Sequence, residues 1–157
     1  MKNKLFLSLS LLVTTQCLFA QNEQKVSDKL REMNSDTIRY MKEQILARKV
    51  FYMGKPLDSL LKDLPMPIKE YSNSDNPKNR FITESTGLYF YSYRDRIDRI
   101  TKKQNPLQLT IIWESPIDFK ELSKSGLLTF GDKWTEATNN FFKNKIIREV
   151  KMQEYNF

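Results

Sequence analysis

Beyond residue 20 the chain contains neither cysteine nor histidine. The 157-residue sequence has a single cysteine, Cys17, and no histidine. A fold built from residues 21–157 therefore cannot rely on disulfides or on cysteine–histidine zinc sites. Thiolate nucleophiles and imidazole-based catalytic triads are excluded for the same reason. We expect a fold held by its hydrophobic core, with no metal and no cofactor.

Residues 1–20 have the layout of a secretory signal peptide. Lys2 and Lys4 precede an apolar run from Leu5 to Val13, and the segment closes on Ala20. We expect cleavage after Ala20 and a periplasmic or secreted protein. A lipid anchor at Cys17 is the alternative, although Gln16 is a poor residue before a lipidated cysteine. No later run approaches the roughly 20 apolar residues of a membrane span.

The remainder, residues 21–157, has the length of one domain. We expect a single compact α+β domain, with about five or six mostly antiparallel strands and three or four helices. The polar segment 72–80 is rich in Asn and Ser and is expected to form a mobile surface loop.

Helical spacing is clearest near the start of the domain, with a slip at 34–36 where a second cap can restart the helix. The apolar residues at this spacing are Val26, Leu30, Met33, Ile38, Met41 and Ile45. A further short helix is expected after Pro56, lined by four leucines between 57 and 64. Later helices are expected to begin at Ser115-Pro116, ending at Gly126, and at Asp132.

Strands are expected where β-branched and aromatic residues concentrate or alternate with polar ones. The clearest alternation runs through 107–114, and a final strand is expected over 146–152. Shorter strands are expected at 50–53, 68–71, 81–85 and 88–92, the last two joined near Thr86-Gly87. Segment 94–103 is compatible with a helix or a strand. Its acid-before-base pairs at i,i+4 favour a helix, whereas its β-branched residues favour a strand.

Two patterns offer catalysis without histidine or cysteine. Ser59 and Lys62 form an S-x-x-K, in which a desolvated lysine would activate the serine, and Ser74-Asp75-Asn76 and Ser85-Thr86-Gly87 complete a partial motif set. The 12 Ser and 18 Lys of the chain predict about 1.4 such S-x-x-K matches by chance. The carboxylate pairs Glu114/Asp118 and Asp95/Asp98 are better explained by helix capping and surface ion pairs.

Aromatic and basic residues concentrate in one place. Three tyrosines alternate along a predicted strand and lead into three arginines, giving a candidate binding patch of Tyr89, Tyr91, Tyr93, Arg94, Arg96 and Arg99. Such a patch suits a protein partner or an anionic glycan. The competing interpretation places all three tyrosines in the core beneath a helix.

The charge distribution does not favour nucleic acid. Residues 1–20 hold two of the 26 basic residues and none of the 19 acidic ones, which leaves the domain at +5, spread along its length. The sequence therefore predicts an exported, non-catalytic binding or interaction module. A small hydrolase using carboxylates or a Ser/Lys pair, and a structural envelope component, are the alternatives.

Overall fold

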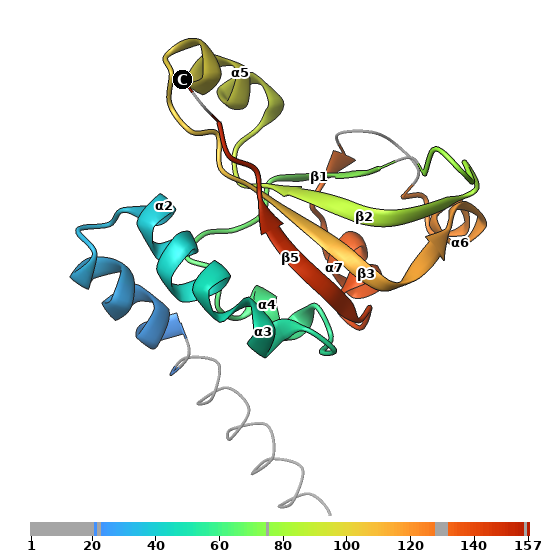
Figure 1. Ribbon diagram of the computed structural model, residues 1–157, viewed down its shortest axis with the longest axis horizontal. Helices are drawn as coiled ribbons and strands as arrows, with labels where there is room; N and C mark the ends of the chain where they lie inside the picture. The colour runs from blue at the N-terminus through green and yellow to red at the C-terminus, as the bar shows by residue number, and fades with distance from the viewer. Residues whose placement is uncertain (1–20, 22, 75, 128–131, 156) are drawn as a thin grey trace, which may run out of the picture.

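The computed structural model describes residues 21, 23–74, 76–127, 132–155 and 157. The predicted signal peptide lies outside these residues. The protein is an α+β domain around one antiparallel sheet (Figure 1). The strands are β1 (Glu70–Asn73), β2 (Ile82–Tyr89), β3 (Gln108–Asp118), β4 (Asp132–Lys133) and β5 (Ile147–Met152), in the order β4-β1-β2-β3-β5.

The sheet has four strands of four or more residues, and β4 adds only a two-residue pairing beside β1. The predicted count of five or six strands was therefore too high for the main sheet. The count of helices was too low. The described chain has a helical run at 23–32, followed by α2 (Thr37–Tyr40), α3 (Lys49–Tyr52), α4 (Asp58–Leu61), α5 (Tyr93–Thr101), α6 (Phe119–Lys124) and α7 (Glu136–Phe142).

The first part of the domain confirms the helical spacing and its interruption. Asn34 and Ser35 both have positive φ angles, and the chain restarts at Thr37 with Asp36 accepting a hydrogen bond from the Arg39 backbone N–H. Between α2 and α3 the helix continues as a π-helical segment (Met41–Ile45) and a 3₁₀ segment (Leu46–Arg48). Of residues 50–53, predicted as a strand, residues 50–52 form the end of this helix, and Met53 follows it in an extended conformation.

The core lies on one face of the sheet. Alternate residues of β3 point inward, and Leu109, Ile111 and Trp113 are all buried. In Figure 1, α7 lies behind the sheet, and its Phe142 stacks on Trp113 with ring centroids 5.6 Å apart. Trp113 Nε1 donates to Thr86 Oγ1 at 3.0 Å, which satisfies the buried indole.

The opposite face of the sheet carries polar and small residues. Ser72 on β1, Gly87 and Tyr89 on β2, and Thr110 on β3 alternate with the core residues of their strands. Ser72 Oγ and Tyr89 Oη share a hydrogen bond of 2.7 Å, and a Cβ added at Gly87 would lie 3.2 Å from that hydroxyl. β2 runs through Gly87 from Ile82 to Tyr89. The prediction of two strands joined near Thr86-Gly87 was therefore wrong.

Two predicted helix starts were misplaced. β3 continues through Ser115-Pro116, and α6 begins after Asp118, whose side chain accepts from the Lys120 backbone N–H. Asp132 pairs in β4, whereas Thr135 caps α7 in a capping box with Thr138. Gly126 does end α6, with a φ of +69°.

The loop expected at 72–80 begins later, because Ser72 and Asn73 belong to β1. Its described part is organised by asparagine side chains. Asn76 Oδ1 accepts from the backbone N–H groups of Lys78 and Asn79, and Asn79 Oδ1 accepts from that of Phe81.

Candidate interaction surface

Helix α5 resolves the ambiguous segment 94–103 and carries most of the predicted patch. Its N-cap is Ser92, whose hydroxyl accepts from the Asp95 backbone N–H. None of its nine residues is buried. In Figure 1 the helix projects from one end of the sheet, beside the C-terminus. The helix is therefore an appendage of the sheet, attached on one side and exposed on the others.

Arginine side chains attach α5 to the sheet. Arg96 Nη2 donates to Glu70 Oε2 on β1 at 3.0 Å, and both side chains are largely buried. The other Glu70 oxygen accepts from the Tyr93 backbone N–H at 3.0 Å. The Arg96 guanidinium also lies over the Tyr89 ring, 3.6 Å from its centroid. One carboxylate and one aromatic ring thus fix the first turn of the helix.

Arg99 makes the second attachment. Its Nε donates to the Asn105 carbonyl at 3.0 Å, and its guanidinium lies 4.3 Å from the Tyr91 ring centroid. Tyr91 packs against the edge of the hydrophobic core.

The buried Arg96 Nε has no hydrogen-bond partner among the described residues. Stacking on Tyr89 is therefore the main contact of that edge of the guanidinium.

The C-terminal segment lies against the same cluster. Tyr155 Oη donates to Gln108 Oε1 at 3.4 Å, and the Tyr155 ring stacks on Phe157 at 5.9 Å between centroids. Burial, with a smaller contribution from nearby Tyr89, raises the pKa of Tyr155 above its ordinary value, while Arg96 opposes the shift. Tyr155 is therefore a neutral hydrogen-bond donor at neutral pH.

The three tyrosines do not form the predicted ladder. β2 ends at Tyr89, Tyr91 follows it outside the strand, and Tyr93 is the first residue of α5. Tyr89 and Tyr91 are half-buried beneath arginines, whereas Tyr93 is 66% exposed. Of the arginines, Arg96 and Arg99 hold the helix in place, and Arg94 is exposed. The structure thus brings five of the six predicted residues into contact, chiefly with one another and with the sheet.

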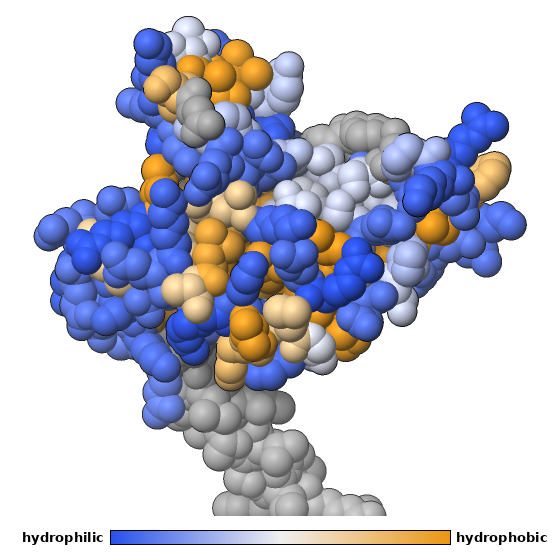
Figure 2. Space-filling view, in the orientation of Figure 1, coloured by the Kyte–Doolittle hydropathy of each residue, from blue (hydrophilic) through white to orange (hydrophobic). Residues whose placement is uncertain are grey.

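The exposed part of α5 includes an apolar stripe, beside the exposed charged side chains of Arg94, Asp95 and Asp98. Successive helical residues are rotated by about 100°, so positions 93, 97 and 100 fall on one stripe. Tyr93 is 66% exposed, Ile97 48% and Ile100 37%, and the nearby C-terminal Phe157 is 54% exposed. Figure 2 shows hydrophobic side chains at the α5 end of the molecule. We call Tyr93, Ile97, Ile100 and Phe157 the α5 surface.

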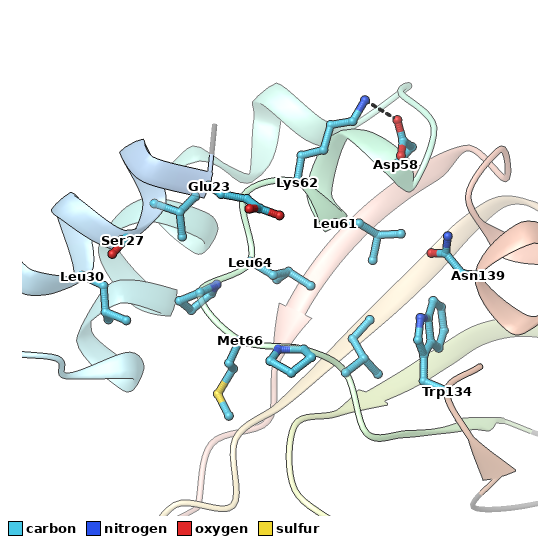
Figure 3. A pocket seen from close by; sticks show the side chains of 14 residues that line it. Glu23, Ser27, Leu30, Asp58, Leu61, Lys62, Leu64, Met66, Trp134 and Asn139 are labelled. Atoms are coloured by element: carbon cyan, nitrogen blue, oxygen red, sulfur yellow. Dashed lines mark ion pairs between the residues drawn. The ribbon is translucent and has the colours of Figure 1, made fainter. Parts of the chain in front are cut away.

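A groove lies elsewhere, between the helical run at 23–32 and the segment 58–68 (Figure 3). It encloses about 610 Å³. Its walls are mostly apolar and include Leu30, Leu61, Leu64, Met66 and Trp134. Figure 3 places Trp134 and Asn139 on one side, opposite Glu23 and Leu30. The groove has room for an apolar side chain or a small apolar ligand, and sequence periodicity gave no signal for it.

The S-x-x-K pair does not form a desolvated nucleophile site. Lys62 lies at the rim of the groove, its side chain is 45% exposed, and it forms an ion pair with Asp58. The Ser59 hydroxyl donates to the Pro56 carbonyl at 2.8 Å. A charged lysine held by a carboxylate is a poor base for a serine hydroxyl.

The other candidate groups are also engaged in structural contacts. Ser74 and Ser85 share a 2.6 Å hydrogen bond across β1 and β2, and Asp75 lies outside the described residues. Asp95 bonds to Ser92 and Asp98 to Lys102, and Asp118 caps α6. Within the described part of the chain, no group of three acidic side chains is placed to hold a metal ion. None of its helices is long and apolar enough to cross a membrane.

Comparison with known proteins adds no relative. No protein-family model, no curated protein and no solved structure matches the chain.

Proposed function

We propose that the protein is a non-catalytic interaction module that binds another protein through the α5 surface. The observation that carries the proposal is that α5 packs on the sheet through two arginines and leaves an apolar stripe exposed. A helix packed on a domain normally turns its apolar stripe inward and its charges outward. Here Arg96 and Arg99 point at the sheet, while Tyr93, Ile97 and Ile100 face solvent.

Exposure of the apolar stripe of α5 has a physical rationale if a partner protein covers that stripe. The Arg96–Glu70 ion pair and the two arginine–tyrosine stacks hold the helix without using its isoleucines. Those isoleucines and Tyr93 then form a preorganised apolar surface, which lowers the entropy lost on binding. An exposed tyrosine such as Tyr93 is typical of the residues that dominate binding energy.

The residue types favour a protein over an anionic glycan. Sugar rings stack on aromatic faces, and an anionic polymer needs unpaired cations. Of the tyrosines, Tyr89 and Tyr91 already have arginines over their rings. The exposed stripe is mainly aliphatic, which suits the apolar centre of a protein interface.

A photo-crosslinking experiment tests the proposal. Benzoylphenylalanine is placed at Tyr93, or at Phe81 as a control, because both side chains are 66% exposed and Phe81 lies on the loop before β2. Cells that naturally make the protein should yield a defined adduct from position 93 and none from position 81.

The crosslinked protein is then identified, purified and tested for direct binding. Ile97→Asp should weaken that binding by at least about tenfold, because it places a charge in the apolar centre of the interface. Phe81→Asp should leave the affinity unchanged. Equal affinities of Ile97→Asp and the unaltered protein would refute the proposal.

A further inference from the structure

A second group of exposed apolar side chains lies on α3 and the start of β5, away from α5. Val50 is 75% exposed, Phe51 49%, Met53 43% and Ile146 37%. Of the α3 residues only Tyr52 is buried, with its hydroxyl donating to Asp63 Oδ2. We call Val50, Phe51, Met53 and Ile146 the α3 tip. In Figure 1, α3 and α5 lie at opposite ends of the view.

Backbone hydrogen bonds hold the α3 tip in its exposed position. Gly54 N–H donates to the Ile147 carbonyl at 2.8 Å, and Ile147 N–H donates to the Lys55 carbonyl at 2.9 Å. Pro56 and Ile146 form an isolated antiparallel bridge. Gly54 has a φ of +72°, which permits the turn that brings these segments together. The exposure of the tip is therefore a property of the folded domain.

Cations surround the tip. Lys55 Nζ lies 3.2 Å from the centroid of the Phe51 ring, and Arg48 Cζ lies 5.5 Å from it. The nearby carboxylate of Glu149 is shared by Lys49 and Lys151, at 3.7 and 3.2 Å. Four basic side chains thus lie in this region, with Glu149 and Asp63 as the neighbouring acidic ones. Lys145, next to Ile146, is paired with Glu121.

We propose that the α3 tip docks the protein on an anionic phospholipid bilayer. Apolar side chains backed by lysine and arginine match the two layers of such a surface, acyl chains below and phosphates above. Each cation near an anionic leaflet adds favourable attraction, and the Lys55 and Arg48 stems remain close to Phe51 when their charges reach the phosphates. A bilayer fits better than an acidic protein. An acidic protein would offer complementary charge, but it has no acyl layer to receive the three neighbouring apolar side chains Val50, Phe51 and Met53.

This docking is independent of the partner proposed for α5. With the α3 tip on the bilayer, the α5 end of the molecule points away from it (Figure 1). A protein docked on the bilayer through the α3 tip would therefore keep its α5 surface accessible to a protein partner.

Vesicle co-sedimentation tests the proposal. The protein is mixed with vesicles of phosphatidylcholine alone or of equal parts phosphatidylcholine and phosphatidylglycerol. We expect sedimentation with the anionic vesicles only, reduced at high salt. Phe51→Ser should weaken binding by about tenfold or more, because it removes the largest apolar side chain of the tip. Lys55→Glu should weaken binding to anionic vesicles and reduce its dependence on salt.

Phe81→Ser is the control, because Phe81 is also an exposed phenylalanine but lies outside the tip. All variants keep the same N-terminus, so their differences report on the tip alone, and thermal melts monitored by circular dichroism establish that each is folded. Failure of the unaltered protein to bind anionic vesicles would overturn the proposal, as would equal binding by Phe51→Ser or an equal loss in Phe81→Ser. None of these results bears on the α5 surface.

Discussion

Arg96 on α5 and Glu70 on β1 form a largely buried ion pair, 3.0 Å long, across 26 positions of sequence. The same carboxylate accepts the backbone N–H of Tyr93, so Glu70 fixes both the first turn of α5 and its rotation about the helix axis. This rotation directs Arg96 and Arg99 toward the sheet, whereas Arg94 and the two isoleucines are exposed. Glu70 therefore acts with the two arginine–tyrosine contacts to leave the apolar stripe of α5 exposed.

Replacement of Glu70 by Gln should loosen α5 without unfolding the sheet. The loss of a hydrogen-bonded charge partner for buried Arg96 should lower the free energy of unfolding by about 1.5–3 kcal/mol. Urea denaturation measures that change, and hydrogen exchange should show faster exchange confined to 93–104. Arg94→Ala is the control, because Arg94 is exposed, and should change stability by no more than about 0.5 kcal/mol.

Thr86 connects two buried polar groups, and its hydroxyl should be needed for stability. Thr86 Oγ1 donates to Asn73 Oδ1 at 2.9 Å and accepts from Trp113 Nε1 at 3.0 Å. Thr86→Val keeps the shape but leaves the indole N–H unpaired, at a cost of about 1–3 kcal/mol. Thr86→Ser keeps the hydroxyl, so calorimetry should show a smaller loss. Equal losses would show that packing of the methyl group matters more than the hydrogen bonds.

The two tryptophans should differ in their contributions to stability. Trp113 is 1% exposed and stacks on Phe142, so Trp113→Ala should cost about 3–5 kcal/mol. Trp134 is only half-buried, at the side of the groove, and Trp134→Ala should cost clearly less. Chemical denaturation of both variants provides the comparison. The difference follows from burial, because only Trp113 is fully enclosed by the core.

Alkaline pH should destabilise the protein through Tyr52. Burial, followed by the hydrogen bond to and the charge of Asp63, raises the pKa of Tyr52 above its ordinary value. The unfolded chain then releases this proton at lower pH than the folded one, so stability is complete below pH about 10 and falls as pH rises further. Tyr52→Phe should show a shallower alkaline decrease, measured by urea denaturation at a series of pH values.

Tyr40 and Tyr155 also have raised pKa values, chiefly through burial, so part of the alkaline decrease should remain in Tyr52→Phe. An identical pH dependence in the variant and the unaltered protein would show that Tyr52 does not contribute. At neutral pH the variant should lose about 1 kcal/mol, the usual value of one hydrogen bond.

Local patterns predicted those elements whose burial follows their own sequence period. β3 confirms the strand predicted from the alternation over 107–114, and β5 lies where the final strand was expected. The helices between Val26 and Ile45 confirm the interrupted helix predicted from their apolar spacing. Local patterns also identified the arginines and tyrosines that attach α5, because these residues are close in sequence. Glu70, the partner of Arg96, was not among them. Local patterns did not predict which of these arginines and tyrosines would face solvent.

The sequence by itself determined that this domain folds on an apolar core without disulfides or zinc, since residues 21–157 contain no cysteine or histidine. Tertiary structure decided the rest through contacts between distant residues. Val50–Met53 has the composition of a strand, but burial of Tyr52 and its bond to Asp63 favour helix there. Likewise Glu70, far from α5 in sequence, pairs with Arg96 and helps to fix which side of the helix is exposed, a contact that local sequence patterns do not contain.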